Sequence, residues 1–257
     1  MTRLLSGLLA LALAAFAQFT EAQAVPELRS RAAPGSTRVL FIGNSLTYTT
    51  DIPERVAKVA DATGRKAVIE TVAIASFSLE DHWTDGRALA AIRKGWDVVV
   101  LQQGTSADAD GREQLIEYAK RFAKPIREAG AKPALYMVWP LKERPKEFAA
   151  AIASYRAAAK AIDAILIPAG EAWLRALSKE PRLRLYSDSI HPSSYGSDLC
   201  VLSIYFSLFP AGAQEFDEAY VARIAKTLEI PADRRDFFFD VVTRAIDEPL
   251  VISAIDP

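Results

Sequence analysis

Five short apolar runs that alternate with helical stretches are the feature that most constrains the fold of this chain. The runs are residues 39–42, 67–74, 97–101, 134–138 and 164–167. Apolar runs of this length are typical of strands that are buried on both faces of a parallel sheet. The alternation therefore predicts an α/β fold, in which helices cover a five-stranded parallel sheet and ligands bind at the carboxyl ends of the strands.

Helices are predicted between these strands and after the last one. Apolar residues recur at helical spacing soon after Asp51, and Ser78 precedes an acidic first turn that suits a helix start. No linker separates the last helices from the sheet, so we expect a single domain over residues 25–257, with a core at about 38–209 and a helical extension at 210–257. The other predicted helices are residues 79–93, 113–129, 146–162, 171–178, 194–209, 218–228 and 234–246.

The amino terminus has the pattern of a secretory signal peptide. Arg3 is followed by an almost wholly apolar stretch, residues 4–19, and by the small-x-small site Ala22-Gln23-Ala24. The alternative is an uncleaved anchor, but the stretch is shorter than the about 20 residues that a span requires. We therefore predict cleavage of residues 1–24, a periplasmic or secreted protein, and no stable membrane insertion after cleavage. Its one cysteine, Cys200, excludes an internal disulfide.

Charge and motif content exclude several function classes. The formal net charge is -1, with 31 Lys and Arg against 32 Asp and Glu, so neither nucleic acid nor an anionic membrane is the expected partner. The chain has no GxSxG elbow, no GxxxxGK[ST] loop and no HExxH motif. Two distant histidines cannot form a His-rich zinc site. We predict no cofactor and no metal.

Ser45 is the first candidate for catalysis. It follows Gly43 in the turn between the first strand and the first helix, near positive helix ends at the carboxyl edge of the sheet. A serine hydroxyl becomes a nucleophile when a base takes its proton. Many serines in such turns are only caps, so Ser45 needs a partner.

Asp188 and His191 are that expected partner. A carboxylate beside an imidazole orients the ring and stabilises the cation that forms, and Pro192 restrains the loop just after the histidine. The chain has only two histidines. The other, His82, is a rival base near Asp81 and Asp85, but on a helix we interpret it as a packing or pocket-wall residue.

Together, Gly43-Asn44-Ser45-Leu46 and Asp188-x-x-His191-Pro192 resemble the SGNH (GDSL-type) hydrolase superfamily, in an exported branch where GNS replaces GDS. The resemblance spans about residues 38–209, because the order of strands and helices also matches. It implies a three-layer α/β/α sandwich with a flavodoxin-like five-stranded parallel sheet. It also implies an ester hydrolase with Ser45 as nucleophile, His191 as base and Asp188 as its partner.

The oxyanion hole departs from the pattern of this family. The family commonly uses the nucleophile's own amide, a glycine amide after the second strand and an asparagine side chain after the third. Here the backbone N–H of Ser76 stands where the glycine is expected, and Gln103 or Ser106 replaces the asparagine. Losing one donor typically costs about 3 kcal/mol of transition-state stabilisation, so a slow enzyme is one expectation.

The predicted function is therefore an exported serine esterase that acts on a small acyl ester, such as an O-acetyl group on a carbohydrate. Trp83, Trp139 and Tyr195 are candidates for the walls of a sugar-sized pocket, and simple packing is the equally common alternative for aromatic residues at such places. Two alternatives stay open at this stage. One is a lipid esterase or thioesterase, and the other is a catalytically silent carbohydrate-binding protein on the same fold.

Overall fold

The computed structural model of the chain describes residues 35–210, 212 and 216–251. The predicted signal peptide, residues 1–24, lies outside the described residues. Within the described part, none of the helices combines the length and the apolar character needed to cross a bilayer.

The predicted parallel sheet is present. Its strands are β1 Ser36–Gly43, β2 Lys66–Ala73, β3 Val98–Leu101, β4 Lys132–Tyr136 and β5 Ile165–Ile167. They run parallel in the order β2-β1-β3-β4-β5, which is the flavodoxin-like order. Because β1 lies between β2 and β3, the residues that follow these three strands meet at one edge of the sheet.

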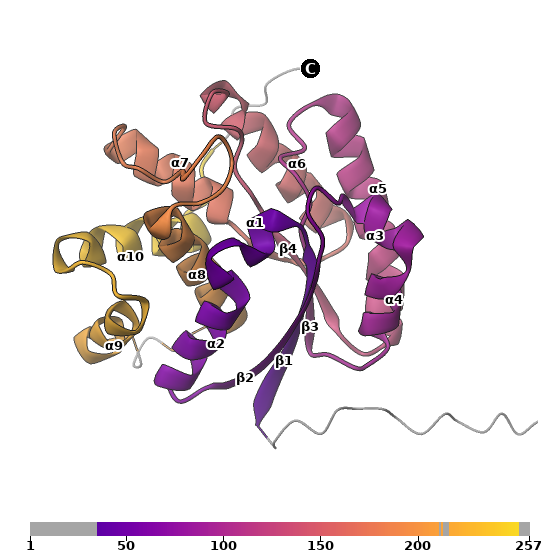
Figure 1. Cartoon of the computed structure of the whole chain (residues 1–257), viewed down its shortest axis with the longest axis horizontal. Helices are drawn as coiled ribbons and strands as arrows, with labels where there is room; N and C mark the ends of the chain where they lie inside the picture. The colour runs from indigo at the N-terminus through magenta and orange to yellow at the C-terminus, as the bar shows by residue number, and fades with distance from the viewer. Residues whose placement is uncertain (1–34, 211, 213–215, 252–257) are drawn as a thin grey trace, which may run out of the picture.

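Helices cover both faces of the sheet, which confirms the predicted three-layer architecture (Figure 1). One layer contains α2 and α8, with α9 and α10 outside them, and the other contains α3 to α6, while α7 packs between α6 and α8. The helices are α1 Ser45–Tyr48, η1 Thr49–Asp51, α2 Ile52–Ala62, α3 Leu79–Asp85, α4 Arg87–Ile92, α5 Ala109–Glu128, η2 Pro145–Glu147, α6 Phe148–Ala161, α7 Ala169–Lys179, α8 Ser194–Leu208, α9 Glu218–Leu228 and α10 Ala232–Asp247.

One predicted helix is wrong in its continuity. Residues 79–93 form two helices, α3 and α4, which are separated by Gly86 in the left-handed conformation at φ 82°. A residue with this φ ends a helix, and glycine adopts it without a Cβ penalty. The break lets α4 turn back along the sheet before β3 begins.

The helix that follows the predicted catalytic histidine is buried on all sides. Leu199, Cys200, Val201 and Leu202 are consecutive and fully buried, because α8 lies between the sheet and the outer helices. At its first turn, a Cβ on Gly196 would overlap the Leu185 carbonyl oxygen and the Trp173 ring. This close approach places the start of α8 against the loop that leads to His191.

We expect Gly196→Ala to lower the free energy of unfolding by about 1–3 kcal/mol, because neither a backbone carbonyl nor a buried indole can move away cheaply. Urea denaturation measures the change. Gly212→Ala is the control, since a Cβ there meets no atom within 4 Å. Equal stabilities of the two variants would contradict the packing described here.

Candidate active site

Ser45 is the first residue of α1, and only Asn44 separates it from the end of β1. Asn44 caps this short helix, since its Oδ1 accepts a hydrogen bond from the Leu46 amide at 3.1 Å. A Cβ on Gly43 would overlap side-chain oxygens of Thr47 and Gln102. Glycine is therefore required at the strand end so that Thr47 and Gln102 can pack against the turn that carries the half-buried Ser45.

The structure brings Ser45, His191 and Asp188 into one hydrogen-bonded row. His191 Nε2 lies 2.9 Å from Ser45 Oγ, and His191 Nδ1 lies 2.7 Å from Asp188 Oδ2. Because an ionised carboxylate only accepts, Nδ1 donates to Asp188 and Nε2 is left to accept the Ser45 proton. This is the arrangement in which an imidazole acts as a general base toward a hydroxyl.

Asp188 is held ionised by its own loop. Its Oδ1 accepts hydrogen bonds from the amides of Ile190 at 2.8 Å and of His191 at 2.7 Å. The Ile190 amide first, and then the His191 side chain and amide, lower the pKa of Asp188 to about 2. The carboxylate therefore stays charged at any pH at which the imidazole can act as a base.

The loop that carries this pair is a short hairpin. The Ser193 amide donates to Leu185 O at 2.8 Å, the Ser187 amide donates to His191 O at 2.9 Å, and Tyr186 bridges Pro192 between them. We call residues 185–193 the catalytic hairpin. These hydrogen bonds fix the backbone on both sides of Asp188 and His191.

Trp139 supports this hairpin from the interior of the fold. Its Nε1 donates to Ile190 O at 2.9 Å, and its ring stacks on Trp173 with 3.6 Å between centroids. The side chain is fully buried, so Trp139 is a support and the sequence-based interpretation of it as a pocket wall is wrong. Trp83 packs edge-to-face on Phe122, and Tyr195 lines a different hollow.

A cavity of about 360 Å³ opens at Ser45. Ser76, Gln103 and Ser106, the predicted oxyanion donors, line it together with Ser45. Ser76 has a φ of 64°, so it adopts the left-handed conformation that a glycine would take at this place.

The side chain of Gln103 is engaged inside the fold. Its Oε1 accepts from the Leu79 amide at 3.2 Å, and its Nε2 donates to Ser106 Oγ at 2.9 Å. Ser106 Oγ thus receives one hydrogen, while its own proton faces either Gly104 O, at 3.3 Å, or the cavity that it lines. Gln103 therefore orients Ser106.

Gln102 is a site residue that sequence reasoning missed. It is fully buried, and its Oε1 accepts from the Asn44 amide at 2.9 Å and from Thr47 Oγ1 at 2.7 Å. Its Nε2 donates to Asn44 Oδ1 at 3.0 Å. Asn44 Nδ2 in turn donates to Phe77 O at 3.0 Å, next to Ser76. Gln102 therefore fixes Asn44, and the Asn44 side chain connects the nucleophile turn with the Ser76 loop. The only sequence signal for Gln102 was an amide residue directly after a buried strand.

His82 has a structural contact close to the nucleophile. The ring is fully buried, and its Nε2 donates to Gly43 O at 2.7 Å. Burial lowers the pKa of His82, an effect that the bond to Gly43 and the charges of Asp85 and Asp81 offset only in part. His82 is therefore neutral and holds the end of β1, in agreement with its predicted packing role.

An ion pair connects the two halves of the site. Arg55 on α2 pairs with Asp198 on α8, and Thr50 Oγ1 meets Ser197 Oγ beside it. Burial outweighs the attraction of Arg55 and raises the pKa of Asp198 to about 6. The segment after Ser45 is thus joined directly to the helix after His191.

No group of three or more His, Cys, Asp or Glu side chains in the described part of the chain could hold a metal ion. Among the residues that the structure describes, the nucleophile–base pair that the geometry offers at the cavity is Ser45 with His191.

Comparison with solved structures identifies the fold. A candidate SGNH hydrolase from Slackia heliotrinireducens superposes with a TM-score of 0.55 at 25% identity, covering 67% of this chain and 99% of its own. The chain has the fold of the SGNH hydrolases. This confirms the resemblance found in the sequence.

Two further structures agree. A GDSL-like lipase from Parabacteroides merdae superposes with a TM-score of 0.55 at 15% identity, covering 67% of this chain and 95% of its own. A variant of an acetyl xylan esterase from Geobacillus stearothermophilus gives 0.56 at 14% identity and covers 68% and 96%. No family model and no curated protein sequence matches the chain. At 25% identity, the Slackia heliotrinireducens structure supports a hydrolase of the SGNH type, and the other two support the fold.

We expect Gln102→Ala to lower kcat for p-nitrophenyl acetate about 10- to 100-fold with little change in KM, because Asn44, which connects the nucleophile turn with the Ser76 loop, loses the side chain that positions it. The Asn44 amide is left buried and unpaired, so stability also falls, by about 1–3 kcal/mol.

Ile126→Val separates the two effects. Ile126 is fully buried in α5, and its loss of a methylene costs about 1 kcal/mol without touching the site. This variant should keep the wild-type kcat. If it lost as much activity as Gln102→Ala, general destabilisation would explain both.

His82→Gln should change how stability depends on pH. The unfolded chain takes up a proton on His82 near its ordinary pKa of 6.5, whereas the folded state, with its lowered pKa, does so only at lower pH. The stability that a neutral His82 contributes is therefore lost as pH falls below about 6.5. Denaturation at pH 7.5, 6.5 and 5.5 should show a steeper acid loss in the wild type than in the variant. Parallel pH curves would contradict the lowered pKa.

Proposed function

We propose that this protein is a serine esterase that removes a small acyl group, such as an O-acetyl group, from a carbohydrate. The observation that carries the proposal is the row Asp188–His191–Ser45, with hydrogen-bond lengths of 2.7 and 2.9 Å, at the mouth of a small cavity. Export of the protein, with residues 1–24 as a cleaved signal peptide, is part of the proposal and rests on the amino-terminal sequence.

The first half of the reaction forms an acyl-enzyme. Ser45 Oγ attacks the carbonyl carbon of the ester while its proton passes to His191 Nε2, and the charge of Asp188 stabilises the imidazolium. The C–O bond to the alcohol then breaks, and the alcohol oxygen takes the proton from Nε2. The acyl group remains on Ser45.

Water completes the turnover. His191 Nε2 accepts a proton from water as its oxygen attacks the acyl carbon, and it returns the proton to Ser45 Oγ when the carboxylic acid leaves. In both steps negative charge develops on the carbonyl oxygen. The proposed donors to that oxygen are the backbone N–H groups of Ser45 and Ser76 and the hydroxyl of Ser106, which Gln103 orients.

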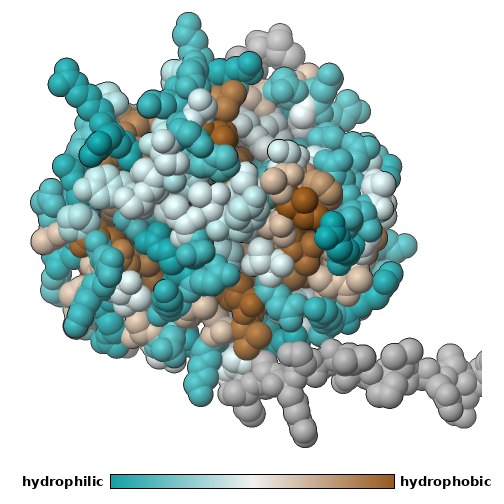
Figure 2. All heavy atoms as spheres, in the orientation of Figure 1, coloured by the Kyte–Doolittle hydropathy of each residue, from teal (hydrophilic) through white to brown (hydrophobic). Residues whose placement is uncertain are grey.

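The lining of the cavity favours a small acyl group on a polar alcohol. Ser78, Thr105 and Gln114 add polar groups to those already named, and the volume of about 360 Å³ suits a short acyl chain. The middle of the face shown in Figure 2, where α1 lies in Figure 1, is mostly white and teal, and brown apolar residues form small separate patches. A long acyl chain would need a continuous apolar trough, so the carbohydrate ester is the better match.

The chemistry of one neighbour supports this substrate class. The Geobacillus stearothermophilus protein is an acetyl xylan esterase, and it shares the fold at 14% identity. The polar cavity of this chain is an independent observation that leads to the same class of ester.

Labelling with a fluorophosphonate probe tests the mechanism. Ser45 Oγ should displace fluoride, so that the intact protein gains the mass of one probe less HF, and Ser45→Ala and His191→Ala should abolish labelling and reduce ester turnover at least about a thousandfold. The two variants should keep the wild-type circular dichroism spectrum, because Ser45 and His191 lie at the surface end of the fold.

Ser189→Ala is the matched control, since Ser189 is an exposed serine at the tip of the catalytic hairpin. It should label at the wild-type rate. A folded wild-type protein that takes up no probe would remove the serine-esterase mechanism, and binding to neutral and acidic oligosaccharides would then be measured directly.

A further inference from the structure

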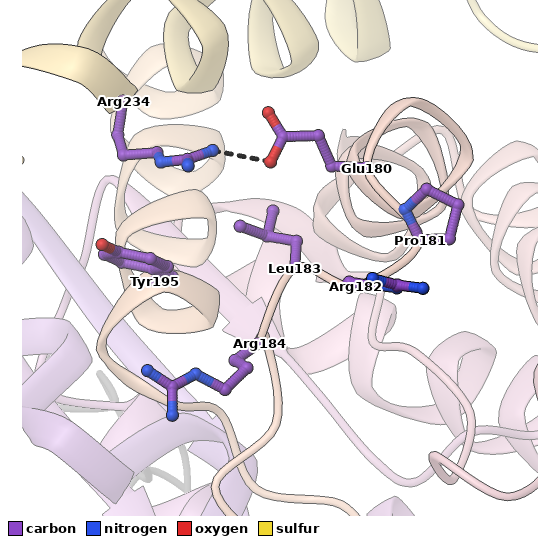
Figure 3. Close-up of a pocket in the computed structure, with 7 residues that line it drawn as sticks. All are labelled: Glu180, Pro181, Arg182, Leu183, Arg184, Tyr195 and Arg234. Atoms are coloured by element: carbon purple, nitrogen blue, oxygen red, sulfur yellow. Dashed lines mark hydrogen bonds and ion pairs between the residues drawn. The ribbon is translucent and has the colours of Figure 1, made fainter.

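A second hollow lies beside the base of the catalytic hairpin. It encloses about 620 Å³ between the segment after α7, the first turn of α8 and the first turn of α10. Arg182, Arg184 and Arg234 line it together with Leu183 and Tyr195 (Figure 3). We call it the arginine hollow. Nothing in the proposed acyl-transfer chemistry uses these residues.

The hollow has an excess of positive charge. Arg234 is paired, with Glu180 at 2.6 Å and with Asp233 at 3.4 Å. Arg182 and Arg184 are exposed, and neither side chain has an ion-pair or hydrogen-bond partner among the described residues. Since Glu180 is the one carboxylate in the lining and is already used by Arg234, two guanidinium groups are left for an anion from outside.

An apolar surface lies between these charges. Figure 3 draws Leu183 and Tyr195 between Arg234 on one side and Arg184 on the other. The Tyr195 ring is held by an edge-to-face contact with Phe238, with 5.4 Å between centroids. An aromatic face beside guanidinium groups suits a ring that carries a carboxylate, because the ring stacks while the charge is paired.

The catalytic hairpin connects this hollow with the active site. The Arg184 carbonyl accepts a hydrogen bond from Ser193 Oγ at 2.6 Å, at the base of the hairpin. His191 is two residues from Ser193, so the backbones of Arg184 and His191 are on the order of 10 Å apart. Ile190, at the tip, lines the cavity at Ser45. The cavity at Ser45 and the arginine hollow thus lie within the length of a short oligosaccharide.

We propose that the arginine hollow binds an acidic sugar residue of the same carbohydrate whose ester is cleaved at Ser45. The inference rests on the proposed function and narrows its substrate class to acylated oligosaccharides that carry a carboxylate. Figure 3 draws the Arg184 guanidinium on the side of Tyr195 and the Arg182 guanidinium on the opposite side of the segment. Arg184 therefore pairs with the carboxylate, Tyr195 and Leu183 contact the sugar ring, and Arg182 adds positive charge at the far rim of the hollow. The pairing determines which substrates are preferred, while the acyl-transfer steps are unchanged.

The test compares two O-acetylated oligosaccharides of equal length, one of galacturonate and one of neutral xylose. The wild type should have the higher kcat/KM on the acidic substrate. The double variant Arg182→Gln/Arg184→Gln should lose about fivefold on that substrate only, the size expected for one exposed guanidinium–carboxylate contact together with the loss of a second nearby positive charge. Salt at about 0.5 M should reduce the preference of the wild type by screening.

Two controls keep the failure of this inference distinct from the failure of the proposed function. Arg93→Gln removes an exposed arginine at the end of α4, toward the amino end of β3 and away from the carboxyl ends of the strands where Ser45 lies. It should leave kcat/KM unchanged on both substrates. Turnover of p-nitrophenyl acetate reports the esterase alone and should be equal in all variants. If the wild type did not hydrolyse p-nitrophenyl acetate, the proposed esterase activity would be contradicted, and the binding role of the arginine hollow would be judged by the binding measurement.

A binding measurement completes the test without catalysis. By calorimetry, Ser45→Ala should bind trigalacturonate more tightly than xylotriose, and the two arginine substitutions should remove the difference. Equal binding of the two sugars, or equal kcat/KM with and without the arginines, would overturn the proposal. Inhibition by inorganic phosphate that matches the effect of trigalacturonate would also overturn it, because the hollow would then recognise a free anion and no sugar.

Discussion

The hydrogen bonds between Gln102 and Asn44 are the interaction on which the geometry of the site depends. They connect the ends of β1 and β3, two strands that lie side by side, through a side chain with no exposure to solvent. In such surroundings a polar group without a partner is costly, so each amide hydrogen and oxygen has one favourable place. Asn44 in turn caps the helix that begins at Ser45 and donates a hydrogen bond to Phe77 O, next to Ser76.

The histidine side of the site is ordered by different contacts. The catalytic hairpin is fixed by its own backbone hydrogen bonds, by Trp139 below Ile190 and by the close packing of Gly196 on Leu185. Arg55 and Asp198 then join the helix after Ser45 to the helix after His191. The nucleophile turn and the catalytic hairpin are thus each held by their own contacts, and the 2.9 Å hydrogen bond between Ser45 and His191 joins them.

The loop after β3 combines support with chemistry. The side chains of Gln102 and Gln103 are both buried and hydrogen-bonded to neighbouring loop residues, and the proposed side-chain donor at the cavity is Ser106. A hydroxyl that already accepts one hydrogen bond is a better donor of its own proton, because hydrogen bonds in a chain polarise one another. In the proposed oxyanion hole, the Ser106 hydroxyl thus takes the place of the asparagine amide that this family commonly uses. Gln102 and Gln103 position neighbouring groups instead of donating to the substrate.

The sequence by itself determined the order of elements and the parallel sheet, and it predicted Ser45, Asp188 and His191 as the three residues that the structure then brings together, because apolar periodicity and short motifs are local properties of the chain. It did not predict the break at Gly86, since a single left-handed glycine is inconspicuous inside a helical pattern. The roles of Gln102 and Trp139 and the arginine hollow were decided only by the tertiary structure. Each of them depends on contacts between segments distant in sequence, such as Asn44 with Gln102 or Arg184 with Ser193, and side-chain type alone does not encode which partner a buried polar group will find.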